Sequence, residues 1–204
     1  LEESLAADYS VTEDISAGYA MAGVEIGRWS LVGGVRVERT DAEYSAFDLV
    51  FDDGDLVPED VTRRKGSNDY TNYLPSLHAQ LWVRDDLIVR GAWTNTLGRP
   101  AYESLVPLRE FEIDPDGNGG FEGSVVEGNP ELDPIESMNF DVSVEWYLRP
   151  AGLVSLAVFH KEIDNPIYTE VTELEDEDFE GRFFSELSIE QPRNAVDGQI
   201  TGIE

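Results

Sequence analysis

The stretch MNFDVSVEWYL, from Met138 to Leu148, shows most directly how this chain folds. Every second residue, such as Phe140, Val142 and Val144, is apolar, and most of the residues between them are polar. Strict alternation of this kind predicts a β-strand with two unlike faces. Eleven residues is about the length of a tilted strand that crosses a membrane.

The same alternation recurs along the chain. Strands are expected at Ile15 to Ile26, Leu31 to Thr40, Ser76 to Arg84, Leu87 to Thr96 and Leu153 to Ile163, and a seventh near Gln199. The pattern leaves the facing of Leu153 to Ile163 open, because that segment is apolar throughout. Trp93, Trp146, Tyr19 and Tyr147 lie near strand ends, where barrels in membranes carry aromatic girdles.

The connections between these strands alternate between short and long. Three are turns of a few residues, at 27–29, 84–86 and 149–152, and three are long loops, at 46–70, 98–136 and 164–196. The long loops hold 27 of the 43 acidic residues and 7 of the 14 basic ones. Short turns on one side and long loops on the other are typical of outer-membrane β-barrels.

Composition excludes several classes of function. The formal net charge of -29 disfavours binding to nucleic acid or to anionic lipid through a basic patch. The absence of cysteine rules out disulfides and thiolate metal sites, and two histidines are too few for a multi-histidine site. No apolar run reaches the roughly 20 residues of a membrane-spanning helix, and the N-terminus, LEES, does not resemble a signal peptide. The chain is interpreted as a mature or excised segment.

Catalysis finds no support in the sequence, so the chain is not expected to be an enzyme. It contains neither the G-x-S-x-G motif of a serine nucleophile nor a phosphate-binding P-loop. Carboxylate pairs are uninformative in so acidic a chain.

A glycine-rich segment, DPDGNGG from Asp114 to Gly120, is a candidate calcium site. Asp114, Asp116 and Asn118 occupy the first, third and fifth positions of an EF-hand-type loop, with glycine in the sixth. Val125 stands where that loop requires a glutamate. Calcium binding and a plain acidic loop tip both remain open, and so does cation binding by the acidic run from Glu173 to Glu180.

Several motifs together resemble the TonB-dependent receptors. The segments GGVRVERT (33–40), NYLPSL (72–77), LIVRGAWTNTLGRP (87–100) and GNPELDPIES (128–137) match motifs of that family in its order and spacing. The resemblance covers about Glu13 to Glu204, and the GNP-x-L-x-P-x-E-S run is its most specific part.

The resemblance implies an all-β fold, an antiparallel up-and-down transmembrane β-barrel of about 22 strands around a plug. Six to seven of those strands, with long extracellular loops, are expected here, so residues 1–204 are interpreted as a partial barrel domain. The plug, the TonB box and the C-terminal strands are expected to lie outside this sequence.

Two sets of residues follow from this interpretation. The polar face of the strands is expected to line the lumen, with Arg36, Glu38, His78, Gln80, Arg90, Thr94, Asn139, Asp141 and Glu145. Ion pairs are expected from Arg36 and Arg90 to Glu38 or Glu145. The motif residues expected to act structurally are Arg99, Pro100, Gly128, Asn129, Pro130, Pro134, Glu136 and Ser137, with Arg99 pairing Glu103 or Glu136.

Two functions from different classes are compatible with these patterns. As the resemblance implies, the chain belongs to a receptor in the outer membrane of a Gram-negative bacterium that takes up a scarce small ligand. The ligand is a siderophore, a vitamin or a carbohydrate, and TonB with its inner-membrane complex supplies the energy through the plug. The alternative is a soluble all-β binding module that recognises its partner with acidic loops, and a porin is a third interpretation.

Overall fold

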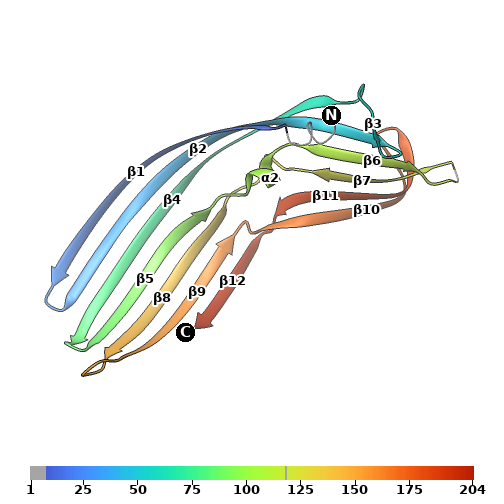
Figure 1. Ribbon diagram of the computed structural model, residues 1–204. Helices are drawn as coiled ribbons and strands as arrows, with labels where there is room; N and C mark the ends of the chain where they lie inside the picture. Colours follow the sequence, from blue (N-terminus) through green and yellow to red (C-terminus); the bar gives the residue numbers. More distant parts are fainter. Residues whose placement is uncertain (1–7, 118) are drawn as a thin grey trace.

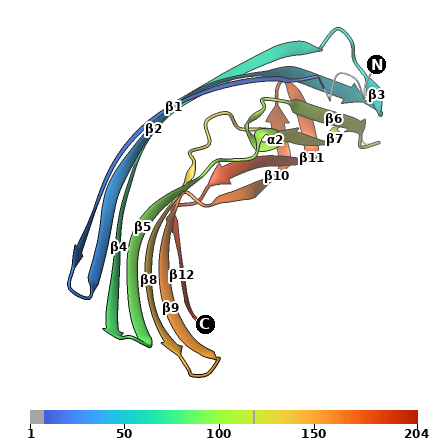
Figure 2. The same ribbon diagram turned by 60° about the vertical axis from the view of Figure 1, so that its left-hand side comes forward.

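The computed structural model describes residues 8–117 and 119–204, and the described chain is almost entirely β-structure. Its elements are β1 (Ser10–Ile26), β2 (Trp29–Asp52), β3 (Asp55–Leu56), β4 (Thr62–Arg84), β5 (Leu87–Gly98), α2 (Tyr102–Leu105), β6 (Arg109–Pro115), β7 (Phe121–Glu127), β8 (Ile135–Tyr147), β9 (Leu153–Asp164), β10 (Ile167–Phe179), β11 (Arg182–Asn194) and β12 (Asp197–Ile203). All twelve strands belong to one sheet. The sheet curves strongly, so that it has a convex outer and a concave inner side (Figures 1 and 2).

The curved part of the sheet, called the wall below, is an antiparallel meander. It runs β1-β2-β4-β5-β8-β9-β12, and each strand pairs antiparallel with the next. Tight turns join β1 to β2 and β4 to β5, as expected from the sequence, and Gly27 adopts a φ of 63° in the first of them. A positive φ of that kind is accessible to glycine at little cost.

The second part, called the head below, consists of two hairpins that continue the sheet beyond the wall. β6 pairs antiparallel with β7, and β10 pairs antiparallel with β11. The head joins the wall through parallel pairing of β6 with β2, and its two hairpins join through parallel pairing of β7 with β11. The expected all-β fold is confirmed, but the expected antiparallel up-and-down arrangement of six to seven strands describes only the wall, because the whole sheet is mixed and has twelve strands.

The edge of β2 explains where the head attaches. β1 covers that edge up to the pair Ser10–Ser45, and β6 takes over the same edge at the pair Asp48–Arg109. Strand edges carry unpaired N–H and C=O groups that a further strand satisfies. Strand β2 therefore pairs with strands of the wall along most of its length and with the head at its end.

The three long connections are largely strand, contrary to the expectation of long loops. Strand β2 extends to Asp52 and β4 begins at Thr62, so only a short connection with β3 separates them. The other two connections contain the hairpins β6–β7 and β10–β11. The strands of these hairpins alternate apolar and acidic residues. This pattern suits a strand that has one face covered and the other in water, because such a strand requires only one apolar face.

Two small clusters of buried residues stabilise the upper half of the molecule. The first lies in the head and contains Phe111, Ile113, Val125, Phe184 and Leu187. The second lies on the inner side of β2 and contains Ala42, Tyr44, Leu105 and Leu132. Each brings together residues far apart in sequence, so the head and its connections are fixed on the wall by burial of apolar area.

Candidate ligand-binding site

The outer face of the wall carries an apolar belt. One row of directly paired residues runs across five strands through Leu31, Ala79, Gly91, Val142 and Val158. The adjacent row runs through Trp29, Leu81, Val89, Val144 and Leu156. Within the described strands neither row contains a charged side chain. The sequence predicted this face for β2, β4, β5 and β8, and the register now adds Val154, Leu156 and Val158 of β9 to it.

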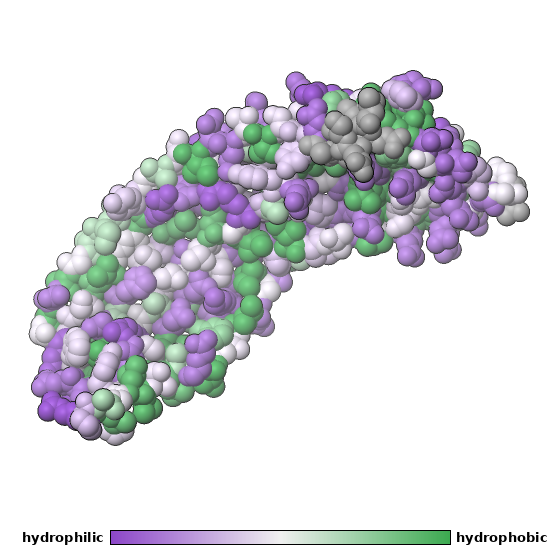
Figure 3. Space-filling model, viewed as in Figure 1, coloured by the Kyte–Doolittle hydropathy of each residue, from purple (hydrophilic) through white to green (hydrophobic). Residues whose placement is uncertain are grey.

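The belt ends where charges begin. On β2 the first charged outer side chain is Arg39, which binds Asp41 at 2.8 Å and Asp69 at 3.5 Å. The Arg39 guanidinium donates hydrogen bonds to Asp41 and thereby lowers the pKa of that carboxyl. Beyond this boundary hydrophilic residues dominate the surface, especially over the head (Figure 3).

Two of the four expected girdle aromatics do not lie on the outer face. Tyr19 is paired directly with Arg36, and Tyr147 donates a hydrogen bond of 2.8 Å to Glu145. Both therefore lie on the inner face. The weak alternation of β1 gave no facing for Tyr19, whereas Tyr147 occupies a polar position of β8. Trp93 and Trp146 do share the outer face with Val142.

All nine residues expected to line a lumen share the inner face of the wall. Arg90 lies between Gln80, 3.1 Å away, and Glu145, with which it forms an ion pair. Arg36 forms an ion pair with Glu38 on the same strand, and Asn139 donates to the Thr94 carbonyl at 3.2 Å. The remaining two, His78 and Asp141, line a hollow of about 330 Å³ together with Gln80 and Arg90.

A segment called the strap, residues 99–108, crosses this inner face above that hollow. Arg99 binds Glu38 at 2.6 Å, and Tyr102 donates to Glu13 at 3.1 Å. The hydrogen bond to the Glu13 carboxylate raises the pKa of the Tyr102 hydroxyl. The expected pairing of Arg99 with Glu103 or Glu136 is wrong, because the chain turns inward after Gly98 and carries the guanidinium to β2.

The strap covers the buried cluster on β2. Leu105 packs against Ala42 and Tyr44, which are 4% exposed. Burial raises the pKa of the Tyr44 hydroxyl to about 12. Pro100 is also buried at the start of the strap.

The GNP segment, residues 128–134, packs directly under the strap. The Asn129 amide donates to the Ser104 carbonyl at 2.7 Å. A Cβ atom on Gly128 would lie 1.9 Å from the carbonyl oxygen of Val106, so the strap can approach only because this residue is glycine. Pro130 lies close to Gly66 as well, where a Cβ would be 2.3 Å from the proline ring.

The same segment also connects to β11 and β4. Asn129 donates its side-chain amide to the carbonyl of Pro192 at 3.1 Å, and Asp133 and Asn194 exchange two hydrogen bonds. Pro134 then leads into β8, where Glu136 accepts a bond of 2.6 Å from Asn72. Further along, Ser137 donates to Asn139 at 3.0 Å. The motif residues thus connect the strap, the wall and the hairpin β10–β11.

The candidate calcium residues lie at the turn between β6 and β7. Asp116 accepts a hydrogen bond of 2.9 Å from the Gly120 amide, which closes the turn. Asp114 is paired across the hairpin with Glu122. Asn118 lies outside the described residues. The described residues contain no group of three or more metal-binding side chains, and calcium binding stays a prediction.

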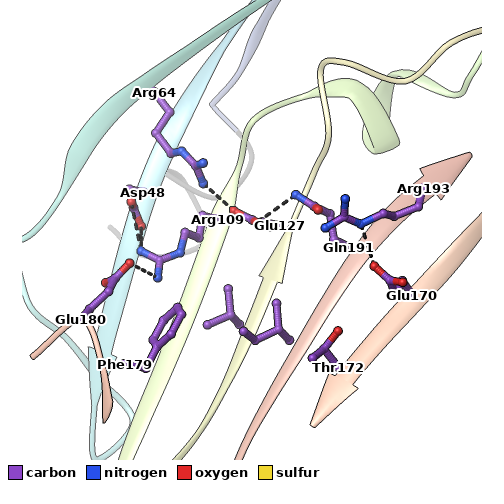
Figure 4. Close-up of a pocket in the computed structure, with 12 residues that line it drawn as sticks. Asp48, Arg64, Arg109, Glu127, Glu170, Thr172, Phe179, Glu180, Gln191 and Arg193 are labelled. Carbon is purple, nitrogen blue, oxygen red and sulfur yellow. Dashed lines mark hydrogen bonds and ion pairs between the residues drawn. The ribbon is translucent and has the colours of Figure 1, made fainter. Parts of the chain in front are cut away.

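A polar hollow of about 420 Å³ lies on the inner side of the head (Figure 4). It is built on a row of side chains that crosses adjacent strands. The register places Asp48 of β2 beside Arg109 of β6, Arg109 beside Glu127 of β7, and Gln191 of β11 beside Glu170 of β10. Gln191 donates to Glu127 at 2.9 Å, which joins the two halves of the row.

Every arginine at this hollow has a carboxylate partner. Arg109, only 7% exposed, lies 3.3 Å from both carboxylate oxygens of Asp48 and 2.9 Å from Glu180. Arg64 binds Glu127 at 2.9 Å through Nη1. At the other end Arg193 binds Glu170 at 2.7 Å through Nε, as Figure 4 shows.

Apolar side chains lie beside this polar row. Val125 and Ile189, paired across β7 and β11, and Phe179 at the end of β10 line the hollow with Thr172. Phe179 packs edge-on against Phe111, with ring centroids 5.7 Å apart. The hollow therefore has charged and polar groups along one side and an apolar surface next to them.

The sequence analysis did not single out the residues of this hollow. Arg64, Arg109, Gln191 and Arg193 all lie in segments that were interpreted as loops. The segment REFEIDP, Arg109 to Pro115, alternates like a strand, and that short signal could have identified β6. The partners of these residues depend on parallel pairings between distant segments, which alternation does not reveal.

Among the described residues, no helix is long and apolar enough to cross a membrane. A search of curated proteins finds no match. Among solved structures, the hemophore receptor HasR of Serratia marcescens aligns with a TM-score of 0.61 at 16% identity, covering 94% of this chain and 31% of that one. The ferric enterobactin receptor PfeA of Pseudomonas aeruginosa gives 0.55 at 13%, covering 96% and 33%. The siderophore receptor PirA of Acinetobacter baumannii gives 0.51 at 13%, covering 96% and 34%.

These alignments show a shared fold, and the chain spans about a third of the length of each of these structures. The sequence model described as "TonB dependent receptor-like, beta-barrel" matches residues 4–204. The match covers almost the whole sequence, and the chain therefore belongs to the family of TonB-dependent receptor-like β-barrels.

Proposed function

We propose that this chain forms the ligand-receiving side of the barrel in a receptor that takes up a scarce small ligand across the outer membrane. The observation that carries the proposal is the division of one sheet into three surfaces. These are an uncharged belt outside the wall, a polar face inside it, and a polar hollow above the belt.

The dimensions of the belt agree with a membrane location. The ten residue steps from Trp29 to Arg39 span roughly 34 Å along β2 at about 3.4 Å per residue. At a tilt of about 40° this corresponds to roughly 26 Å across the membrane, close to the apolar band of about 25 Å on such barrels. Receptors of this family lie in the outer membrane of Gram-negative bacteria.

The family membership removes the two other interpretations, a soluble all-β module and a porin. The family consists of receptors and transporters, and in the proposal the polar residues of the hollow bind the ligand. In the proposal the strands that close the barrel, the plug and the contact with TonB belong to other parts of the receptor, and residues 1–204 supply part of its barrel domain. The nine inner-face residues then line the lumen, and the GNP segment holds the strap and head in place.

Energy-coupled uptake is tested in cells that carry the receptor. Its gene is deleted, and growth is compared on media in which iron, vitamin B12 or single carbohydrates are limiting. We expect a growth defect on one of these nutrients that the intact gene restores, and that also appears when TonB is removed. Unchanged growth on all of them, or a defect that does not depend on TonB, would contradict uptake as the function.

Location is tested separately by fractionation of the same cells. We expect the receptor in the outer-membrane fraction, with a gel mobility that changes on heating, because folded barrels resist detergent until they are boiled. Recovery in the soluble fraction would contradict the proposal.

A further inference from the structure

The charge of the head hollow bears on the kind of ligand that it accepts. Four carboxylates line it, from Asp48, Glu127, Glu170 and Glu180, against three arginines. Each guanidinium is within 3.3 Å of a carboxylate oxygen, so the arginines are already neutralised before a ligand arrives. From this balance, and from the hydrogen-bonding groups of the lining side chains, we propose that the hollow binds an uncharged, hydroxyl-rich ligand of the oligosaccharide class. The inference rests on the proposed function.

An anionic ligand, such as a metal chelate with several carboxylates, does not fit this charge balance. It would have to compete with Asp48 and Glu180 for Arg109, and with Glu127 for Arg64. The whole chain carries a formal charge of -29, so the long-range field also repels anions from the entrance. A charge-assisted bond formed with the ligand would replace one that the protein already has.

A purely cationic ligand does not fit either, because it brings donors and no acceptors. Arg64 uses only Nη1 and Arg193 only Nε in their ion pairs, and each guanidinium has five N–H donors. Covering the remaining donors with a ligand that cannot accept hydrogen bonds costs about 1–3 kcal/mol for each group that loses water. A hydroxyl group both donates and accepts, so it can satisfy the arginines, the carboxylates and the Gln191 amide oxygen alike.

The shape and the apolar side of the hollow point in the same direction. Its volume of about 420 Å³ is within the usual range for small-molecule sites. Ile189 and Phe179 give an apolar surface beside the polar row. A sugar ring has hydroxyl groups at its rim and C–H groups on its faces, so one ring can contact both kinds of surface.

The test uses the complete receptor, purified in detergent, and isothermal titration calorimetry. The probes are neutral oligosaccharides (maltoheptaose, cellohexaose, xylohexaose and chitohexaose) and, as the anionic chelate, ferric citrate. Binding is measured at low and at high sodium chloride. We expect at least one neutral oligosaccharide to bind, with a Kd that changes less than about twofold with salt, since no ion pair with the ligand is formed.

Variants locate the binding in the hollow. Gln191→Leu and Arg193→Gln each remove hydrogen bonds to the ligand, and a loss of about 1.4 kcal/mol corresponds to a tenfold rise in Kd. Glu112→Gln is the matched control, because Glu112 lies on the opposite face of the same head sheet, paired with Ser124. We expect the first two variants to weaken the oligosaccharide roughly tenfold and the control to leave its Kd unchanged.

The inference and the proposed function fail in different ways. Ferric citrate that binds with a steep salt dependence and is lost in Arg193→Gln overturns the inference, and so does a failure of all four neutral oligosaccharides to bind. If TonB-dependent growth on an anionic chelate is found, uptake stands and only the ligand class is wrong. If no growth phenotype depends on the receptor, uptake fails, and the calorimetry still decides whether the hollow binds sugars.

Discussion

Replacing Val142 by lysine tests whether the outer belt faces lipid. Val142 is the fourth of the five residues in the row from Leu31 to Val158, and its side chain is 55% exposed in the isolated chain. A lysine on the lipid face of a barrel costs about 2–4 kcal/mol at the bilayer midplane. At about 1.4 kcal/mol per factor of ten, the unfolding equilibrium should shift roughly 30- to 1,000-fold.

The assay is urea unfolding of the receptor refolded into phospholipid vesicles, followed by tryptophan fluorescence. The matched control is Ser143→Lys, since Ser143 is the next residue but lies on the inner face, with Asp141 and Glu145 two residues away on the same face. The control should change the unfolding free energy by less than about 1 kcal/mol, as a partly solvated charge near carboxylates does. Equal destabilisation by both variants, or a harmless Val142→Lys, would refute the assignment of the two faces.

Three further predictions concern the upper half of the molecule. Gly128→Ala should destabilise the receptor by roughly 1–3 kcal/mol in the same unfolding assay, because its Cβ would lie 1.9 Å from the Val106 carbonyl oxygen. Arg99→Gln removes the ion pair with Glu38 and should speed hydrogen exchange of amides in the strap, measured by mass spectrometry. Burial raises the pKa of Tyr44 to about 12 in the folded protein. The stability that the neutral Tyr44 hydroxyl contributes should therefore be fully present below its unfolded-state pKa of 10.0, and should be lost as the pH rises through its folded-state pKa.

Each of these predictions has its own control. Gly198→Ala adds a Cβ where no atom lies within 4 Å, so a loss of stability as large as that of Gly128→Ala would contradict the steric argument. Arg149→Gln changes an arginine in the turn before β9, and strap exchange as fast as in Arg99→Gln would mean that the ion pair does not hold the strap. Tyr44→Phe should abolish the alkaline stability loss, and a loss that persists in it belongs to another group.

The wall was predictable from sequence because each strand separates two different environments. Strand β8 was expected at Met138 to Leu148 and spans Ile135–Tyr147, with the expected residues on each face. Alternation is decisive there because a shift of one residue would move every apolar side chain to the polar face. Strand β1 lacks this signal, so its alternation left the facing of Tyr19 open, and the expectation that Tyr19 belongs to an outer aromatic girdle is wrong.

The head and the site were not predictable, because their structure depends on pairings between distant segments. Whether Arg109 pairs with Asp48 depends on β6 joining β2 in parallel. No local pattern encodes that pairing; it follows from the edge that β1 leaves free. The predicted partner of Arg99 was wrong for a related reason. The direction in which the strap leaves β5 determines which carboxylate Arg99 reaches, and this is Glu38 and not an acidic residue nearby in sequence.

Strand β2 connects the hollow to the interior of the wall. Asp48 and Glu38 lie on the same face of this one strand, ten residues apart, or roughly 34 Å along it. Asp48 holds Arg109 at the hollow, and Glu38 holds Arg99 at the strap. The GNP segment joins the strap to β11, which supplies Gln191 and Arg193 to the hollow. Asn129 therefore couples the position of β11 to that of the strap. When a ligand occupies the hollow, we expect hydrogen exchange in the strap to slow.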